Sequence, residues 1–269
     1  MRRSNIVTLT TDFGWRDFYA AAVKGVVLSI HPGALLVDVS HDIPPGDVRG
    51  AALLLAQAVP CFPPGTVHAA VVDPGVGTDR RAIAAEAGGQ ILVGPDNGLF
   101  WPLLAQDPGR RVVHLTEARF FRRTVSRTFH GRDLFAPVAA HLASGRDPDE
   151  MGVRIDDPVV LEEDRPREEN GVLVGEVTRV DRFGNLVTNI RLDVLKGFLG
   201  GREPRIEAGA LEVSGIRGCY GDAAPGEALA LIGSTDCLEL SVNGGAASER
   251  AAPAGGGLSG MEVRVRPGP

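Results

Sequence analysis

The chain is poor in cysteine, and this shortage limits the kinds of site that it can build. Its 269 residues include three cysteines, Cys61, Cys219 and Cys237. They are far apart in the sequence and form no CxxC pair, which argues against a disulfide framework and against a structural zinc site. We therefore expect a cytoplasmic protein without a structural zinc site.

Long apolar runs are also missing. The longest apolar stretch, residues 51–59, is interrupted by Gln57 and is too short to cross a bilayer. The apolar run that follows Arg2 and Arg3 covers only residues 6–9, which is too short for the core of a signal peptide. These patterns predict neither a membrane span nor a secretion signal.

Basic residues are outnumbered by acidic ones, 28 to 34, giving a formal net charge of −6. The basic residues are scattered, so the sequence has no cationic patch of the kind that binds nucleic acid. Hydrophobic residues make up 43% and charged residues 23%, which is ordinary for a folded globular protein. The length is comfortable for two domains.

The first half of the chain alternates β-branched runs with stretches of helical spacing. The expected strands are 6–10, 35–39, 67–72, 82–85, 91–93 and 112–115, and the expected helices are 19–30, 47–59, 99–106 and 134–144. Asp47 stands where it can cap the second helix. Because the strands are apolar on both faces, they favour an α/β layer covered by helices on each side. We predict an α/β domain over residues 1–155 with a largely parallel sheet.

The second half has a different pattern. Residues 156–170 are acidic and contain proline, as expected of a linker. Short strands separated by turn residues follow, at 172–180, 186–190, 206–213, 228–232, 238–242 and 261–265. They predict a smaller all-β, barrel-like domain over residues 171–269. The Ala/Gly/Ser-rich stretch 246–257 is expected to be a mobile loop.

Acidic residues follow or close the first three strands, at Asp12, Asp38 and Asp73. The ends of parallel strands lie along one edge of a sheet, where open α/β folds bind ligands. A single aspartate in this place most often caps a turn, but three along one edge favour a site. There is no phosphate-binding Gly-Lys-Ser/Thr loop and no GxGxxG after a strand, which disfavours nucleotide triphosphatases and Rossmann-type methyltransferases.

Six short sequence motifs are more specific than the pattern of strands and helices. They are TTDFG at 10–14, VDPGVGTDRR at 72–81, PDNGL at 95–99, TFHGRD at 128–133, DRFGNLVTNI at 181–190 and SVNGG at 241–245. In this order the chain resembles the S-adenosylmethionine hydroxide adenosyltransferase family, relatives of the bacterial fluorinating and chlorinating enzymes. The resemblance covers residues 5–245. It implies hydrolysis of S-adenosylmethionine to adenosine and methionine without a metal ion or cofactor, in a homotrimer whose substrates lie at subunit interfaces.

The resemblance also assigns roles to residues. Asp12 matches the position that holds the ribose diol, and Asp17, Asp181 and Ser234 match positions near the methionine group. Phe183, Tyr220 and Asn185 match positions around the adenine, and Asn243 of the SVNGG string is included in the same substrate-binding set. Two alternatives stay open: both aromatic residues could instead belong to the barrel core, since aromatic residues are common there, and Asn185 could simply shape a turn.

Asp73, Arg80 and His130 match the polar triad that distinguishes the hydrolases of this family. The sulfonium is a good leaving group, so the reaction needs an aligned nucleophile rather than a general acid. Water has a pKa of about 15.7, and a carboxylate or a neutral imidazole must help to remove its proton. Arginine stays protonated and can only orient groups and stabilise charge. The sequence leaves open whether Asp73 or His130 accepts the proton.

Other functions are also considered. A halogenase is disfavoured because only Gly88, Gly89 and Gln90 stand where halogenases carry an insertion, and because a carboxylate at position 73 would repel halide. A metal-dependent phosphoesterase or nucleosidase would need the ligands Asp12, Asp38, His41, Asp73, Asp96 and His130 to converge. A sensor would bind the nucleoside without turnover. The chain departs from its relatives in two places: Gly46 stands where the halogenases carry a large aromatic residue, and Thr235 and Asp236 follow Ser234 where some relatives have a turn that contains arginine.

Overall fold

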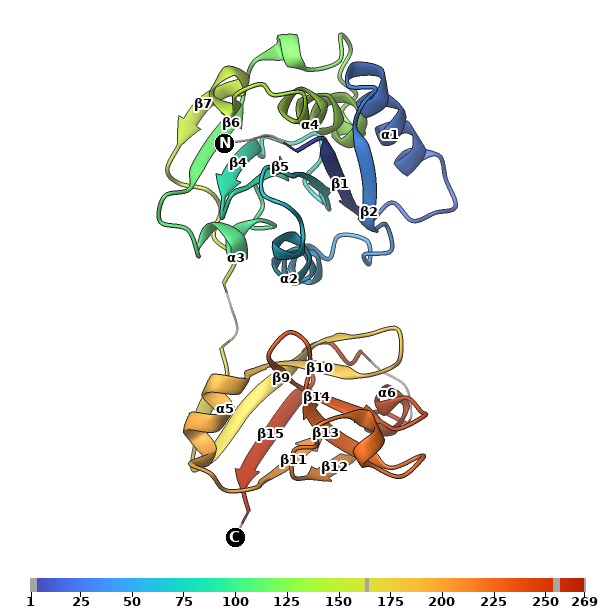
Figure 1. The fold of residues 1–269 in the computed structure, drawn as a ribbon, viewed down its shortest axis with the longest axis vertical. Coiled ribbons are helices and arrows are strands. Elements are labelled where there is room, and N and C mark those ends of the chain that lie inside the picture. Colours follow the sequence, from blue (N-terminus) through green and yellow to red (C-terminus); the bar gives the residue numbers. More distant parts are fainter. Residues whose placement is uncertain (1–3, 163–164, 254–256, 269) are drawn as a thin grey trace. The chain divides into compact units, whose positions relative to one another are not determined.

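The computed structural model describes residues 4–162, 165–253 and 257–268. The chain divides into two compact units, residues 1–162 and residues 163–269 (Figure 1). Each unit has its own sheet and its own hydrophobic core. None of the helices in these described stretches has the length and apolar character that a membrane crossing requires.

The first unit is built on a seven-stranded sheet with the order β2-β1-β3-β5-β4-β6-β7. The strands are β1 (Ile6–Thr11), β2 (Leu35–Ser40), β3 (Val67–Val71), β4 (Ala82–Ala87), β5 (Gln90–Pro95), β6 (Arg111–Leu115) and β7 (Gly152–Ile155). Strands β2, β1, β3 and β5 pair in parallel, whereas β4, β6 and β7 pair antiparallel. The sheet is therefore mixed rather than largely parallel.

A tight turn explains the mixed sheet. Only Gly88 and Gly89 separate β4 from β5, and both have positive φ, 56° and 78°. Two consecutive residues with positive φ form the hairpin turn that matches the twist of paired strands. The pair Gly88-Gly89 therefore folds β4 back on β5, and the expectation of a parallel arrangement overlooked this signal.

Helices cover both faces of the sheet (Figure 1). The helices α1 (Tyr19–Ile30) and α4 (Ala136–Ala143) share one core cluster with the β1 residues Val7 and Leu9. The helices α2 (Val48–Ala58) and α3 (Trp101–Leu104) lie on the other face. Asp47 caps α2 as expected, since its Oδ1 accepts a hydrogen bond from the Gly50 amide at 2.8 Å.

Short helical turns complete this unit: Val59–Cys61, Ala118–Phe120 and Pro148–Met151 are 3₁₀ turns, and Gly131–Phe135 is a π-helical turn that leads into α4. The helix expected over 99–106 is shorter than predicted. It is reduced to α3, four residues long, because Asp107-Pro108-Gly109 turns the chain toward β6.

The second unit is a nearly closed antiparallel sheet with the order β12-β11-β15-β9-β10-β14-β13. Its strands are β8 (Arg167–Glu169), β9 (Val172–Val180), β10 (Leu186–Arg191), β11 (Pro204–Ala208), β12 (Leu211–Ser214), β13 (Ala228–Ile232), β14 (Cys237–Val242) and β15 (Glu262–Pro267). The segment after β12 meets the opposite edge, where the Arg217 amide donates to the Ala230 carbonyl at 2.8 Å. This contact gives the unit the barrel-like form that the strand pattern predicts.

Three details of this unit differ from the sequence-based expectation. The strand expected over 206–213 is a hairpin of β11 and β12, which turns at Gly209 with φ of 58°. The helix α5 (Leu192–Leu199) was not expected. Residues 247–251 of the stretch expected to be a mobile loop form the helix α6 (Ala247–Ala251), whereas residues 254–256 of that stretch lie outside the described residues.

Candidate active site

Asp73, Arg80 and His130 form a continuous chain of contacts in the first unit. The Arg80 Nε donates to both Asp73 oxygens, at 2.9 and 3.0 Å, and its Nη2 also contacts Asp73 Oδ2. The same Nη2 lies 2.7 Å from His130 Nδ1. The Asp73 and Arg80 side chains are 4% and 11% exposed. The arginine therefore stands between the carboxylate and the imidazole, in a setting that water barely reaches.

Close backbone packing brings these three residues together. Gly77 has φ of +78°, and a Cβ on it would lie 2.3 Å from the Arg127 carbonyl oxygen. Only glycine allows both this backbone conformation and this approach. The Asp73–Arg80 loop can therefore pack against the segment that leads into His130. On the other side of His130, a Cβ on Gly131 would lie 3.1 Å from the Phe13 ring, so Phe13 also packs closely here.

The contact with Arg80 defines the protonation state of His130. A guanidinium group only donates hydrogen bonds, so Nδ1 must be the acceptor and the ring proton must lie on Nε2. Burial and the neighbouring Arg80 charge both lower the pKa of His130 below its usual value. The neutral imidazole is therefore the favoured form at neutral pH, with Nε2–H as its remaining donor.

The hydrogen bonds also distribute the capacity to accept a proton. The Nδ1 lone pair of His130 is occupied by Arg80, and Asp73 Oδ2 is contacted by two nitrogens of the same guanidinium. Asp73 Oδ1 accepts a single bond, from Arg80 Nε. A carboxylate oxygen has room for a second donor. Among the three side chains, Asp73 Oδ1 thus keeps the most unoccupied acceptor capacity in this arrangement.

Asp12 and Asp17 lie in the segment that connects β1 to α1. Asp12 follows β1 directly, is partly buried, and accepts a hydrogen bond at Oδ2 from the Gly46 amide at 2.9 Å. Asp17 is exposed. The rings of Phe13 and Phe18, which directly follow Asp12 and Asp17, join a cluster of aromatic side chains with Tyr19 and Phe129. An acidic pair flanked by aromatic surface thus lies beside the segment that carries His130.

The other acidic residues that could have bound a metal are paired elsewhere. Asp38 contacts Lys24 and His41, at 2.6 and 3.0 Å, and Asp96 contacts Arg81 at 2.7 Å. Although burial raises the pKa of Asp38, the bonds from Lys24 and His41 bring it below its usual value. Among the described residues, no group of three His, Cys, Asp or Glu side chains is arranged to hold a metal ion.

In the second unit, Asp181 organises a turn between β9 and β10. Its Oδ1 accepts from the amides of Phe183 and Asn185, and its Oδ2 accepts from the Asn185 side chain at 2.8 Å. Asn185 is buried and shapes this turn, as one of the two interpretations proposed. Phe183 is 76% exposed, so the interpretation that places it in the barrel core is wrong.

Tyr220 is held by a residue that the sequence analysis did not identify. Its hydroxyl donates to Glu239 Oε1 at 2.7 Å, and the Ser241 hydroxyl donates to the same oxygen at 3.0 Å. This bond, with desolvation and the charge of Glu239, raises the pKa of Tyr220 to about 12. Tyr220 is 45% exposed and also lies outside the core. Glu239 is buried within β14. It alternates with apolar residues along the strand, and this pattern does not indicate that it contacts Tyr220.

The remaining two candidates of this unit lie in turns. Ser234 is exposed in the turn between β13 and β14, beside Gly233, where a Cβ would lie 2.8 Å from Glu239 Oε2. Asn243 follows β14, and its side chain donates to the Ala223 carbonyl at 2.8 Å. Asn243 therefore fastens the loop that follows Tyr220. Glu239 and Tyr220 contact each other directly, and Asp181 is near enough to act on Tyr220 by its charge.

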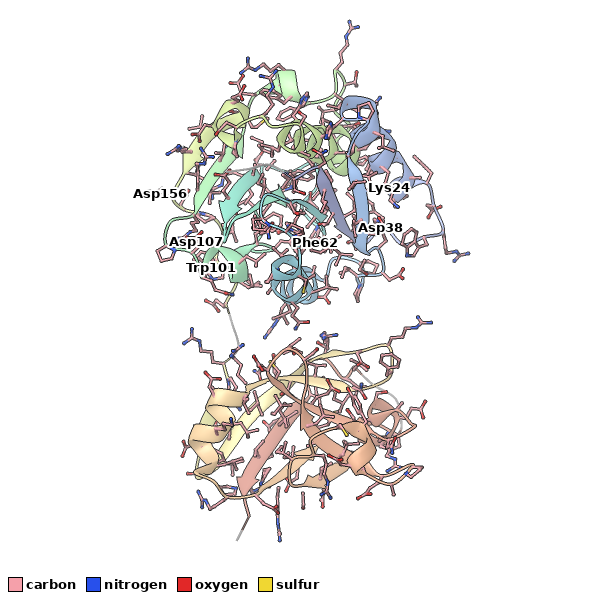
Figure 2. The ribbon with its side chains drawn as sticks, viewed as in Figure 1. Lys24, Asp38, Phe62, Trp101, Asp107 and Asp156 are labelled. Atoms are coloured by element: carbon pink, nitrogen blue, oxygen red, sulfur yellow. The ribbon has the colours of Figure 1, made fainter. Side chains whose placement is uncertain are left out.

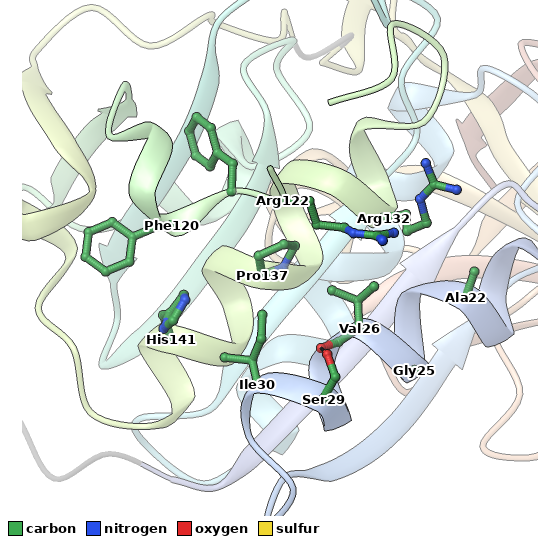
Figure 3. Close-up of a pocket in the computed structure, with 11 residues that line it drawn as sticks. Ala22, Gly25, Val26, Ser29, Ile30, Phe120, Arg122, Arg132, Pro137 and His141 are labelled. Atoms are coloured by element: carbon green, nitrogen blue, oxygen red, sulfur yellow. Dashed lines mark hydrogen bonds between the residues drawn. The ribbon is translucent and has the colours of Figure 1, made fainter. Parts of the chain in front are cut away.

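A separate cavity of about 490 Å³ lies between α1 and α4 (Figure 3). Its walls include Val26, Ile30 and Pro137, with Arg122 and Arg132 at one end. Both arginines also contact the buried Asp133, Arg122 at 3.5 Å and Arg132 at 2.6 Å. None of the residues predicted for the site lines this cavity, so we do not assign the predicted chemistry to it.

The domain models of one protein family match both units. The SAM hydroxide adenosyltransferase N-terminal domain matches residues 7–152, and the C-terminal domain of the same family matches residues 175–256. Together the two matches cover most of the chain, and they fall on the two sheets described above.

Relatives with assigned names share much of the sequence. A protein of Salinispora tropica named (R)-S-adenosyl-L-methionine hydrolase is 43% identical over 247 residues, which are 90% of this chain and 92% of the relative. A protein of the same name from Thermus thermophilus is 41% identical over 266 residues, 96% of this chain and 98% of the relative. A fluorinase of an Actinoplanes species is 30% identical over 223 residues, 72% of this chain and 75% of the relative.

Solved structures show the same fold. An uncharacterized conserved protein from Thermotoga maritima superposes with a TM-score of 0.89 at 35% identity, covering 97% of this chain and 99% of that one. A conserved hypothetical protein from Thermus thermophilus gives a TM-score of 0.74 at 38% identity, covering 98% and 100%. On these matches of sequence, domain order and fold, the chain belongs to the SAM hydroxide adenosyltransferase family.

Proposed function

We propose that this protein hydrolyses S-adenosyl-L-methionine to adenosine and L-methionine. The observation that carries the proposal is the contact chain of Asp73, Arg80 and His130, in which the Asp73 and Arg80 side chains are largely buried. The family supports it, since relatives 40–43% identical are named (R)-S-adenosyl-L-methionine hydrolase. The reaction is an in-line attack of water at the ribose C5′, with methionine as the leaving group.

The three side chains divide the work on the attacking water. Arg80 orients the water and stabilises the negative charge that develops on its oxygen. Asp73 Oδ1 accepts the proton, because the other acceptors of the triad are already occupied by the guanidinium. The neutral His130 donates its Nε2–H to keep the water in line, which is the only donor role left to it.

Substrate recognition is assigned to residues of both units. Asp12 binds the ribose hydroxyls, and its Oδ1 is available because Gly46 bonds to Oδ2. The exposed Phe183 and Tyr220 present aromatic surface on which an adenine ring can stack. We assign the methionine group to Asp17, Asp181 and Ser234, and keep Asn185 and Asn243 as residues that shape the adenine side.

We further propose that the enzyme needs no metal or cofactor. Three carboxylates of the suspected metal cluster are already paired with cationic side chains: Asp38 with Lys24, Asp73 with Arg80 and Asp96 with Arg81. The free cysteines Cys61, Cys219 and Cys237 fit a reducing cytoplasm. A homotrimer is proposed from the family resemblance. The exposed Trp15, Phe18 and Leu35 of the first unit supply apolar surface for contacts between copies. Light scattering of the purified protein should give three times 28.3 kDa.

The activity is tested by incubating the purified protein with S-adenosyl-L-methionine and separating the products by chromatography. We expect adenosine and methionine in equal amounts, with the same rate after treatment with EDTA. Loss of activity with EDTA and recovery with a divalent metal would support a metal-dependent hydrolase instead. Binding of the substrate without any product would support a sensor, and a halogenated nucleoside formed in chloride or fluoride would support a halogenase.

A further inference from the structure

A second chain of hydrogen bonds, which the proposed mechanism does not use, ends at Thr11, the residue before Asp12. Lys24 on α1 contacts Asp38 Oδ2 at 2.6 Å, and Asp38 Oδ1 lies 3.0 Å from His41 Nε2. His41 Nδ1 lies 2.7 Å from the hydroxyl of Thr11, the last residue of β1. Figure 2 shows Lys24 and Asp38 together on the α1 side of the sheet. We call these four residues, Lys24, Asp38, His41 and Thr11, the relay.

Donors and acceptors in the relay agree with a single direction. The Asp38 carboxylate only accepts, so His41 donates from Nε2, and the Nδ1 of a neutral His41 ring is then an acceptor. The Thr11 hydroxyl must then donate its proton to His41 Nδ1. Its oxygen remains free to accept, and the Phe13 amide donates to it at 3.3 Å. The donor and acceptor of each bond therefore follow from those of the bond before it, from Lys24 to the amide of Phe13, the residue after Asp12.

The relay holds the segment that follows β1, residues 12–15, at three points, and we call this segment the Asp12 loop. Besides the Thr11 hydroxyl, the His41 carbonyl accepts from the Gly14 amide at 2.8 Å, and the His41 ring packs edge-on against Trp15 with 4.6 Å between ring centroids. Asp12 lies between these points of attachment. The His41 side chain is fully buried, so its contacts leave it no other partner from solvent.

We propose that the relay is a positioning device for Asp12, through which His41 and Thr11 set the affinity of the site for a ribose diol. The inference rests on the proposed function insofar as Asp12 binds the nucleoside. Neither Thr11 nor His41 touches the substrate in this proposal, so both are positioning residues.

The same strand supplies a matched control. The hydroxyl of Thr8 lies 2.8 Å from His68 Nδ1, so β1 carries a second threonine–histidine pair. Thr8 and Thr11 are equally buried, at 0% and 1% exposure. Because Thr11 is three positions after Thr8 and β1 pairs with β3 without a break from Val7 to Thr11, their side chains lie on opposite faces of the sheet. The Thr8 pair therefore has the same chemistry as the Thr11 pair but no contact with the Asp12 loop.

The test compares three variants: Thr11→Val, which keeps the shape and removes the hydroxyl, Thr11→Ser, which restores it, and Thr8→Val as the control. We expect Thr11→Val to weaken adenosine binding, measured by calorimetry, by about tenfold, the size of one hydrogen bond. The KM for S-adenosylmethionine should rise by a similar factor with little change in kcat. Thr11→Ser should restore binding, and Thr8→Val should leave it within about twofold of the original protein.

A second measurement does not depend on the activity. Hydrogen exchange of the Phe13 and Gly14 amides reports directly on the two backbone bonds that the relay maintains. We expect Thr11→Val to speed exchange in the peptide that contains them, whereas Thr8→Val should not. If the protein turned over no S-adenosylmethionine, this measurement would still decide whether the relay holds the loop, and adenosine calorimetry would decide whether the loop matters for binding.

Three results would overturn the inference. Unchanged exchange and unchanged adenosine affinity in Thr11→Val would show that the hydroxyl does not hold the loop. An equal loss of affinity in Thr8→Val would show that binding follows overall stability rather than the relay. Failure of Thr11→Ser to restore binding would likewise assign the effect to packing of the threonine methyl group.

Discussion

The candidate residues of the two units differ in how far they are bonded to one another and exposed to solvent. In the first unit Asp73, Arg80 and His130 are bonded to one another, and the Asp73 side chain is 4% exposed. In the second unit Phe183 is 76% exposed and Tyr220 is 45% exposed. The groups proposed for the chemistry are thus already assembled, whereas the aromatic groups proposed for binding face solvent.

This difference follows from what each group must do. A polar group that stabilises developing charge is most effective when its neighbours already hold it in a place with little water. An aromatic ring that stacks on a base gains its energy by being covered, so it must be uncovered first. Substitutions of Asp73, Arg80 or His130 should therefore lower kcat, and those of Phe183 or Tyr220 should raise KM.

The largest effect is expected for Asp73→Asn. The amide cannot accept the water proton and no longer pairs with the Arg80 charge, so kcat should fall by about 10²–10³-fold with adenosine affinity retained. Asp96→Asn is the control, because Asp96 forms a comparable buried pair with the adjacent Arg81, and its side chain is 2% exposed. Steady-state kinetics and thermal unfolding of both variants separate the two roles. Equal losses of kcat would assign the effect to folding.

An effect of intermediate size is expected for Phe183→Ala. Stacking of a base on an aromatic ring contributes about 1–3 kcal/mol, so KM for S-adenosylmethionine should rise about tenfold while kcat stays close to its original value. The melting temperature should not change, since the ring is mostly exposed. Val194→Ala, an exposed residue on α5, should change neither parameter. A drop in kcat alone would contradict the assignment of Phe183 to binding.

The smallest effect concerns the pH dependence of kcat/KM. Because burial and Arg80 lower the pKa of His130, the neutral form persists down to a pH below about 6.5, the ordinary histidine value. Protonation then places a second positive charge against Arg80, so kcat/KM should be level above this range and fall as the pH decreases through it. In His130→Asn the side-chain oxygen can still accept from Arg80, and this acid limb should disappear. A limb that persists unchanged would originate from another group.

Part of this site follows from sequence and part does not. Asp12 and Asp73 could be placed at one sheet edge because each follows a strand, and parallel strands bring their ends together. The contact of Arg80 with His130 joins residues 50 positions apart, and only the family resemblance suggested it. No periodic pattern encodes a contact of this kind, since it depends on how Gly77 packs against Arg127.

Two features escaped prediction for physical reasons. The Gly88-Gly89 turn was overlooked because both flanking strands are apolar on each face, so their pattern does not distinguish a hairpin from a parallel crossover. His41 was considered only as a metal ligand. Its actual partners, Thr11 and Asp38, come from neighbouring strands, and a donor–acceptor chain between strands leaves no mark on spacing along the sequence.

The pairing of Asp73 with Arg80 also bears on which nucleophile is favoured beside these two side chains. One negative and one positive side chain cancel, and the neighbouring imidazole is uncharged in its favoured form. A chloride ion beside these side chains would shed its hydration shell without gaining a compensating charge, whereas a water molecule carries no such penalty. The electrical neutrality of these side chains is thus sufficient to favour water over chloride, without a steric barrier to the ion.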